Sequence, residues 1–170
     1  MTDREGKLTI EGDLAVLRFE RRLPYPVEAV WAAITDPQQR GQWLGETTID
    51  AREGGRIEMI PDGPGVPTEH KKMTGRIRVW DPPRVFEHEW HQPILAETGS
   101  VRYELTPDGE GTVLRFTHRG LTPRDGQGFL PGTHAFFDRM EAYLAGEPLP
   151  DWATRYQEVA RSKNGGTNHA

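Results

Sequence analysis

Three histidines interrupt apolar segments of the sequence, and their side chains have the greatest potential for chemistry. His88 and His118 each lie in a segment of alternating polarity, and His134 lies in a segment with helical periodicity. Because imidazole titrates near neutral pH, His88 or His118 together with Tyr103 could act as acid or base in a cyclase- or hydrolase-type reaction. The same groups could instead orient the polar end of a ligand. The structural alternative is that each imidazole is buried and hydrogen-bonded to a backbone or tyrosine partner.

The sequence lacks the usual signatures of catalysis. It has no cysteine, no Gly-x-Ser-x-Gly motif, no phosphate-binding loop and no dinucleotide-binding motif. Three imidazoles are enough to bind zinc, but no His-x-x-x-His pair fixes the geometry of such a site. We therefore predict no catalytic residue, no metal site and no cofactor, and we consider a binding protein better supported than an enzyme.

Composition and charge argue against several kinds of partner. The chain has 170 residues, which suits one domain, and a net charge of −5, whereas phosphate binding needs clustered Lys and Arg. The basic pair Arg21-Arg22 is typical of a solvated strand face. No run approaches the roughly 18 apolar residues of a membrane span, and the polar start does not resemble a signal peptide. We expect a cytoplasmic protein that binds neither nucleic acid nor membrane.

The longest helical pattern extends from Phe129 to Gly146. Its apolar residues recur at i, i+4, i+7 and i+8, which places them on one face: Phe136, Met140, Tyr143 and Leu144. The charged residues Asp138, Arg139 and Glu141 are expected to point away from that face. A helix with so much apolar surface needs a large apolar surface to pack on.

Most of the chain before this helix predicts β-strands that can supply that surface. Segments with a period of two are separated by Gly- and Pro-rich turns, at residues 8–10, 14–20, 48–52, 56–60, 73–80, 85–90, 99–106 and 112–118. Residues 27–34 and 38–43 predict two short helices. The expected fold class is α+β: a curved antiparallel sheet of about six or seven strands wrapped around one long C-terminal helix, with two short helices after the first long strand.

The last part of the chain is expected to lie outside this domain. We assign residues 1–146 to the domain and residues 147–170 to a C-terminal extension. In the extension, Leu149, Trp152, Tyr156 and Val159 form a helical stripe. This stripe could pack back onto the domain, form a homodimer interface or contact another protein. From Asn164 onward we predict a disordered tail.

A series of short motifs has the order and spacing of a known superfamily over residues 8–146. The motifs are Phe19 to Arg22, Val30 to Pro37, Trp43 to Gly45, Gly54 to Arg56, Trp80 to Pro83, Gly111 to Leu114, Thr117 to Leu121 and Gly132 to Gly146. In these segments the chain resembles the START-related helix-grip superfamily, also called SRPBCC or birch-pollen-allergen-like. Within it, the chain is similar to the branch named after the activator of the heat-shock protein 90 ATPase.

The resemblance implies a helix-grip fold whose sheet and long helix often enclose a pocket for an apolar or aromatic ligand. It also implies a second possibility, a chaperone partner and a role in the stress response. Two departures from the family pattern stand out. Thr133 replaces a tryptophan that often stands between Gly132 and His134, which leaves more room near the pocket, and residues 147–170 extend beyond the region of resemblance.

Alternation and helical spacing select the side chains that face the space between sheet and helix. We predict that the following residues bind the ligand: Trp31, Trp43, Phe86, His88, Trp90, Tyr103, Phe116, His118, Thr133, His134 and Phe137. The alternative is that these residues fill a closed core. The entrance is expected near the loop of residues 61–67, Trp43 and Pro131-Gly132. The identity of the ligand does not follow from these patterns.

Overall fold

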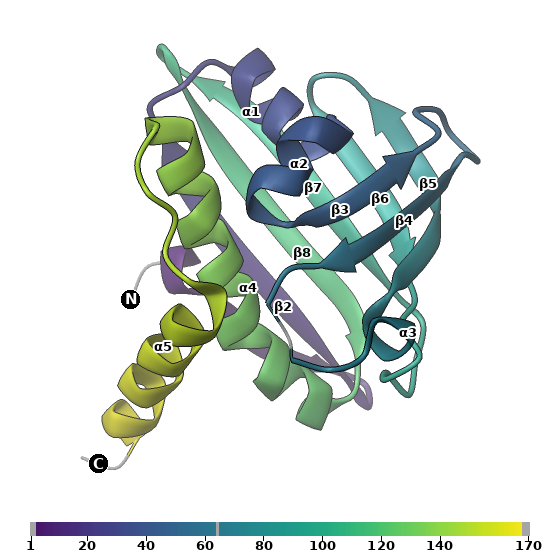
Figure 1. The fold of residues 1–170 in the computed structure, drawn as a ribbon, viewed down its shortest axis with the longest axis vertical. Helices are drawn as coiled ribbons and strands as arrows, with labels where there is room; N and C mark the ends of the chain where they lie inside the picture. The colour runs from purple at the N-terminus through teal and green to yellow at the C-terminus, as the bar shows by residue number, and fades with distance from the viewer. Residues whose placement is uncertain (1–2, 64, 168–170) are drawn as a thin grey trace.

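One antiparallel sheet of eight strands forms the centre of the computed structural model, which describes residues 3–63 and 65–167. The strand order is β1-β2-β8-β7-β6-β5-β4-β3, and the sheet curves around the long helix α4 (Figure 1). The strands are β1 (Lys7–Glu11), β2 (Leu14–Leu23), β3 (Gly45–Ile49), β4 (Arg56–Pro61), β5 (Met73–Asp81), β6 (Val85–Trp90), β7 (Gly99–Asp108) and β8 (Gly111–Leu121). The expected α+β fold class is confirmed.

The sheet has eight strands instead of six or seven, because each of the eight predicted strand segments, including the short ones at the two edges, joins the same sheet. β1 pairs only with β2, and β3 pairs only with β4, each over five residues. β3 also begins at Gly45, three residues before the predicted start, since Gly45 pairs with Pro61 across the ladder.

The helices are η1 (Asp3–Glu5, a 3-10 turn), α1 (Val27–Thr35), α2 (Pro37–Trp43), α3 (Thr68–Lys71), α4 (Pro123–Ala145) and α5 (Trp152–Thr167). The two short helices predicted after the first long strand are α1 and α2. They lie on the same side of the sheet as α4 (Figure 1). The Trp43 indole at the end of α2 donates to the carbonyl oxygen of Ala33 at 2.9 Å, which joins the two helices. Within the described ranges, no helix is both long and apolar enough to cross a membrane.

The long helix α4 begins six residues earlier than predicted. The helical pattern of the sequence starts at Phe129, but α4 starts at Pro123. The Thr122 hydroxyl accepts a hydrogen bond from the Asp125 backbone N–H at 3.1 Å, and Pro123 occupies the first turn, where its missing N–H is not needed. Pro131 lies inside the helix, and Gly146 ends it with a φ of +71°.

The inward face of the sheet is the one that alternation predicted. Nine inward-facing residues of β6, β7 and β8 are buried: Phe86, His88, Trp90, Val101, Tyr103, Leu105, Leu114, Phe116 and His118. From α4, Phe137 and Met140 pack into the same core. The core therefore lies between the concave side of the sheet and the helices α1, α2 and α4.

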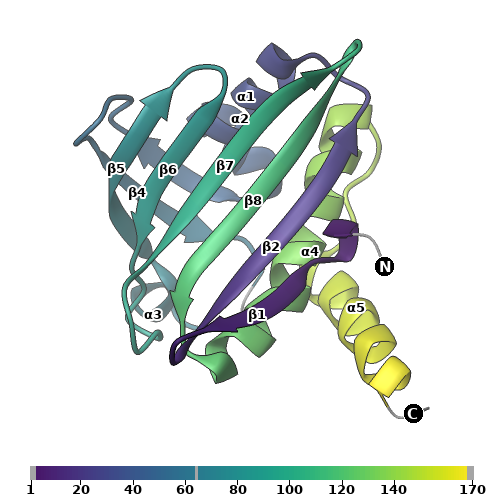
Figure 2. The same ribbon diagram turned by 180° about the vertical axis from the view of Figure 1, so that it is seen from behind.

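The C-terminal extension packs back onto the domain. α5 packs against α4, begins close to the chain's N-terminal end and runs away from it (Figures 1 and 2). Its bounds, Trp152–Thr167, extend past Asn164, where the predicted tail begins. Residues 168–170 lie outside the described part of the chain.

Candidate functional site

A cavity of about 370 Å³ lies between the inner face of the sheet and the helices α2, α4 and α5. Its volume falls within the range of about 300–1,000 Å³ that is typical of small-molecule sites. The lining is mainly aromatic and aliphatic: Trp43, Leu44, Met59, Pro61, Trp90, Ile94, Leu95, Tyr103, Phe116, Phe129, Phe136, Phe137, Trp152 and Tyr156. Polar lining residues are fewer: Gln92, His118, Arg124, Asp125 and Thr133, with Gly128 and Gly132.

The sheet side of the cavity comes from neighbouring strands that are in register. Tyr103 on β7 pairs with Phe116 on β8, and their rings meet edge to face with centroids 5.2 Å apart. Trp90 on β6 contacts His118 at a ring distance of 5.2 Å. Strand alternation sends all four side chains to the concave face. The indole N–H of Trp90 donates to the Gln92 side-chain oxygen at 2.8 Å, which fixes the orientation of this ring.

The helix side of the cavity is a stretch of α4 with small residues. Gly132 and Thr133 line the space between the larger rings of Phe129 and Phe136. Because a tryptophan at residue 133 would project into this space, the small threonine leaves volume open. The extra room predicted at this position is therefore part of the cavity.

Helix α5 covers one side of the cavity. The Trp152 indole donates to the Gly132 carbonyl oxygen at 3.2 Å, and Tyr156 packs beside it at a ring distance of 5.0 Å. Trp152 also lies on Gly63, whose φ is +109° and where a Cβ would come within 2.5 Å of the indole. The stripe that was expected to pack on the domain, form a dimer or bind a partner thus contributes to the cavity wall.

Arg139 holds together the segments around this side of the cavity. Its side chain donates to the Trp43 carbonyl oxygen at 3.0 Å and to the Pro150 carbonyl oxygen at 2.7 Å. It also forms an ion pair with Asp62 at 3.6 Å. Arg139 was expected to point away from the apolar face of the helix, and its side chain links α2, the loop after β4 and the linker before α5.

The structure brings seven of the predicted ligand-binding residues to the cavity: Trp43, Trp90, Tyr103, Phe116, His118, Thr133 and Phe137. The other four predicted residues, Trp31, Phe86, His88 and His134, do not line it. Trp31 and Phe86 form an aromatic cluster with Trp80, with ring centroids 5.3 to 6.4 Å apart. Their inward direction was predicted correctly, but this cluster packs α1 onto the sheet.

His88 is buried beside the cavity and has the structural partner considered in the sequence analysis. Its Nδ1 lies 2.8 Å from the Glu89 carbonyl oxygen, so Nδ1 carries the proton and Nε2 is left without a partner. Burial lowers the pKa of His88 to about 3, and the positive charge of Arg40 adds to this effect. The backbone hydrogen bond opposes the shift. His88 is therefore neutral at physiological pH.

His118 lines the cavity and is also neutral at physiological pH. Burial lowers its pKa to about 3, with a further contribution from His88. Its Nε2 is buried and has no hydrogen-bond partner in the structure. An imidazole with so low a pKa is a poor proton acceptor near pH 7 but can still form a neutral hydrogen bond.

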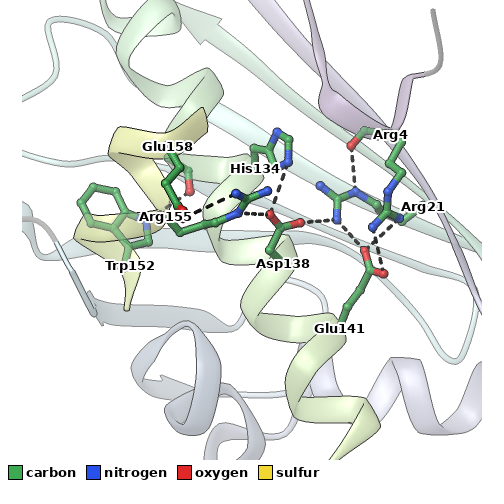
Figure 3. A network of polar contacts seen from close by, with 9 residues as sticks. Arg4, Arg21, His134, Asp138, Glu141, Trp152, Arg155 and Glu158 are labelled. Atoms are coloured by element: carbon green, nitrogen blue, oxygen red, sulfur yellow. Dashed lines mark hydrogen bonds and ion pairs between the residues drawn. The ribbon is translucent and has the colours of Figure 1, made fainter. Parts of the chain in front are cut away.

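His134 points away from the cavity into a network of charged side chains (Figure 3). Its Nε2 lies 3.4 Å from Oδ2 of Asp138, which also accepts a hydrogen bond from Arg155 at 2.7 Å, whereas Oδ1 accepts one from Arg21 at 2.9 Å. Arg21 is fully buried and contacts Glu141 as well. The prediction that Arg21 is solvated and that Asp138 and Glu141 point away from the core is therefore wrong.

Sequence reasoning missed several residues of the cavity wall. Met59 and Gln92 lie in no recognisable motif. The first turn of α4 also lines the cavity, but the helix was expected to start after this turn. It also missed the fully buried Arg40 on α2, whose side chain contacts Met59. The spacing i, i+3 between Arg40 and Trp43 was the available signal, because it places both on one face of α2.

Solved structures with this fold support the architecture. CalU16 from Micromonospora echinospora is 22% identical, with a TM-score of 0.71 and coverage of 92% of both chains. The protein encoded by gene BPP1335 from Bordetella parapertussis is 24% identical, with a TM-score of 0.71 and coverage of 95% of this chain and 91% of that one. DynU16 is 22% identical with a TM-score of 0.64, and the match covers 81% of this chain and 49% of DynU16.

The sequence itself gives the family. No functionally curated protein matches it significantly. A family model does match, over residues 24–145, which extend from the end of β2 to the end of α4 and include most of the cavity wall. The chain belongs to the family of activator of Hsp90 ATPase homolog 1-like proteins.

Proposed function

We propose that the protein binds a small apolar or aromatic molecule in the cavity between the sheet and α4. The observation that carries this proposal is a cavity of about 370 Å³ whose wall is mostly aromatic and aliphatic. A ligand that replaces water there gains about 25 cal/mol for each Å² of apolar surface removed from water. Tyr103, His118 and Thr133 supply polar atoms that can orient it.

The catalytic alternative has less support. The predicted acid or base candidates, His88 and His118, are neutral because burial lowers the pKa of each to about 3. His88 does not line the cavity, and burial raises the pKa of Tyr103, which keeps its hydroxyl protonated. These groups suit hydrogen bonding to a ligand better than proton transfer near pH 7.

The family name suggests a second role, stimulation of a chaperone ATPase through the protein's surface. No feature of the described residues favours it over ligand binding, since Trp152 and Tyr156, which were candidates for such a contact, pack into the cavity wall. The similar solved structures do not distinguish between ligand binding and a chaperone role. One of them, DynU16, is described as a putative protein of the dynemicin biosynthetic locus. An ATPase assay of the host's chaperone, with and without this protein, tests this role directly.

Filling the cavity tests the proposal. The variant Thr133→Trp places an indole in the open space, so the affinity for a naphthalene carboxamide probe should fall at least about tenfold, as measured by calorimetry. Native mass spectrometry of wild-type protein from its host should show a bound small molecule that the variant lacks.

The matched control is Thr106→Trp, which adds the same side chain at an exposed position of β7. It should bind the probe as the wild type does. Equal affinity of the wild type and Thr133→Trp, or no binding of the probe to the wild type, would contradict the proposal.

A further inference from the structure

A fully buried arginine lies directly behind the cavity wall. Arg40 on α2 has an exposed fraction of 0%, and its guanidinium donates to three neutral acceptors besides the Tyr103 hydroxyl. These are the Thr47 hydroxyl at 3.2 Å, the Ile34 carbonyl oxygen at 2.8 Å and the Met59 sulfur at 3.1 Å. The hydrogen bonds satisfy the guanidinium N–H groups but do not neutralise its charge.

The charge of Arg40 has no counter-ion in the protein. Among the described residues, no acidic side chain forms an ion pair with it, whereas the equally buried Arg21 contacts both Asp138 and Glu141. Removing an isolated charge from water costs several kcal/mol, and a buried charge is normally paired. Burial accordingly lowers the pKa of Arg40.

The neighbouring histidines and acids do not compensate this charge. His88 is close enough for the charge of Arg40 to lower its pKa further, and it is neutral. His118 is also neutral, and its Nε2 has no partner. Asp125, the acidic residue of the cavity lining, lies in the first turn of α4 and forms no ion pair with Arg40.

Tyr103 connects Arg40 to the cavity. Its side chain lines the cavity and is hydrogen-bonded to Arg40. Burial raises the pKa of Tyr103, although the charge of Arg40 opposes that shift. Because the guanidinium can only donate, it donates to the phenol oxygen, and the Tyr103 O–H remains able to donate to a ligand. Met59, which accepts from Arg40, lines the cavity as well.

We propose that the ligand is an apolar or aromatic carboxylate, whose anionic oxygen accepts a hydrogen bond from Tyr103 and whose charge compensates Arg40. This inference rests on the proposed function, because it names the class of molecule that the cavity binds. A carboxylate at this position gains a charge-assisted hydrogen-bond network in a region shielded from water. The aromatic and aliphatic side chains that make up most of the wall accommodate the rest of the molecule.

The test compares two probes of nearly equal shape and size by calorimetry at neutral pH, a naphthalene carboxylate and the corresponding carboxamide. Wild-type protein should bind the carboxylate at least about tenfold more tightly, as expected when hydrogen bonds involve a charged group. In Arg40→Met this preference should disappear while the carboxamide still binds. Tyr103→Phe, which keeps the ring but removes the hydroxyl, should also reduce the preference. It provides the test if Arg40→Met does not fold.

The matched control is Arg78→Met, which removes the same charge at a half-exposed side chain of β5 and should keep the preference. Equal binding of both probes to the wild type overturns the carboxylate assignment and leaves the apolar cavity function intact. An unchanged preference in folded Arg40→Met, or in Tyr103→Phe, also overturns it. Binding of neither probe overturns the proposed function and this inference with it.

Discussion

Two neutral histidines next to the cavity connect the stability of the protein to pH. The pKa of His88 and of His118 is about 3 in the folded protein, below the value of 6.5 that an unburied histidine has. Between these values the unfolded chain binds more protons than the folded one. The contribution of each histidine to stability is therefore complete above about pH 6.5 and is lost as the pH falls towards 3.

Replacing His118 by phenylalanine should remove one of these contributions. Its Nε2 has no partner, so His118→Phe loses no hydrogen bond at that atom and keeps a ring of similar shape. The free energy of unfolding should depend less on pH between 4 and 6, with the slope reduced by about 1.4 kcal/mol per pH unit. Urea unfolding at several pH values measures this slope.

A second substitution, His118→Gln, serves as the control for side-chain shape. Glutamine cannot be protonated in this range, so both variants should reduce the slope equally, although their absolute stabilities differ. A slope that stays at the wild-type value in both variants would show that His118 does not take up a proton on unfolding.

At the scale of elements, one carboxylate joins the sheet to two helices. Asp138 on α4 contacts Arg21 from β2, Arg155 from α5 and His134 one turn earlier on α4 (Figure 3). Burial alone would raise the pKa of Asp138, but the hydrogen bonds from His134, Arg155 and Arg21 outweigh it and lower the pKa below its ordinary range. Ionised Asp138 therefore stabilises the folded protein. This stabilisation is complete above the ordinary carboxyl pKa and is lost as the pH falls into the strongly acidic range.

The substitution Asp138→Asn should destabilise the protein by about 3 kcal/mol, because Arg21 would keep its buried charge with one partner fewer. The exposed pair of Asp108 and Arg22 provides the matched control, with a distance of 3.1 Å and side chains 55% and 68% exposed. Asp108→Asn should cost less than about 1 kcal/mol. Denaturant unfolding of both variants tests the difference, and equal losses would contradict this account of the network.

The helix α5 should control access to the cavity. Trp152 lies between Gly63 and Gly132 at the cavity wall, so Trp152→Ala should open a path and raise both the association and dissociation rates of a naphthalene probe. Stopped-flow fluorescence of the probe measures both rates. Tyr143→Ala, which truncates an aromatic residue of α4 outside the cavity lining, is the control. Unchanged rates in Trp152→Ala would show that ligands enter elsewhere.

At the scale of the whole molecule, the sequence was sufficient to predict the strands, the long helix and their layers, but not the short helix α3. Strand alternation identified the inward face correctly through residues such as Phe86 and Phe116, because one face of the sheet is buried and the other is not. The order of motifs gave the family before any geometry was known. Both results depend on patterns that extend over many residues.

What the sequence did not reveal depends on single contacts between distant segments. Arg21 and Arg40 were not expected in the protein interior, since arginine is mostly exposed. Arg21, however, lies two residues after Phe19 on β2, so both side chains face the same side of the sheet. This strand alternation could have predicted that Arg21 is buried. The contact of Trp152 with Gly63 joins residues whose local sequences carry no common pattern. The cavity, which is a space left by many side chains, could only be located once they were placed.

The pairing of β2 with β8 has a consequence for how the chain folds. These strands lie side by side (Figure 2), although they are far apart in the sequence. Phe19 pairs with Phe116, and Leu23 pairs with Thr112. During synthesis, one edge of β2 can pair with β1 early. The hydrogen-bonding groups of its other edge remain unpaired until β8 has been made as far as Leu121. Within this domain, an early strand is thus among the last to have both edges paired, and its apolar side chains are covered only by segments that are made later.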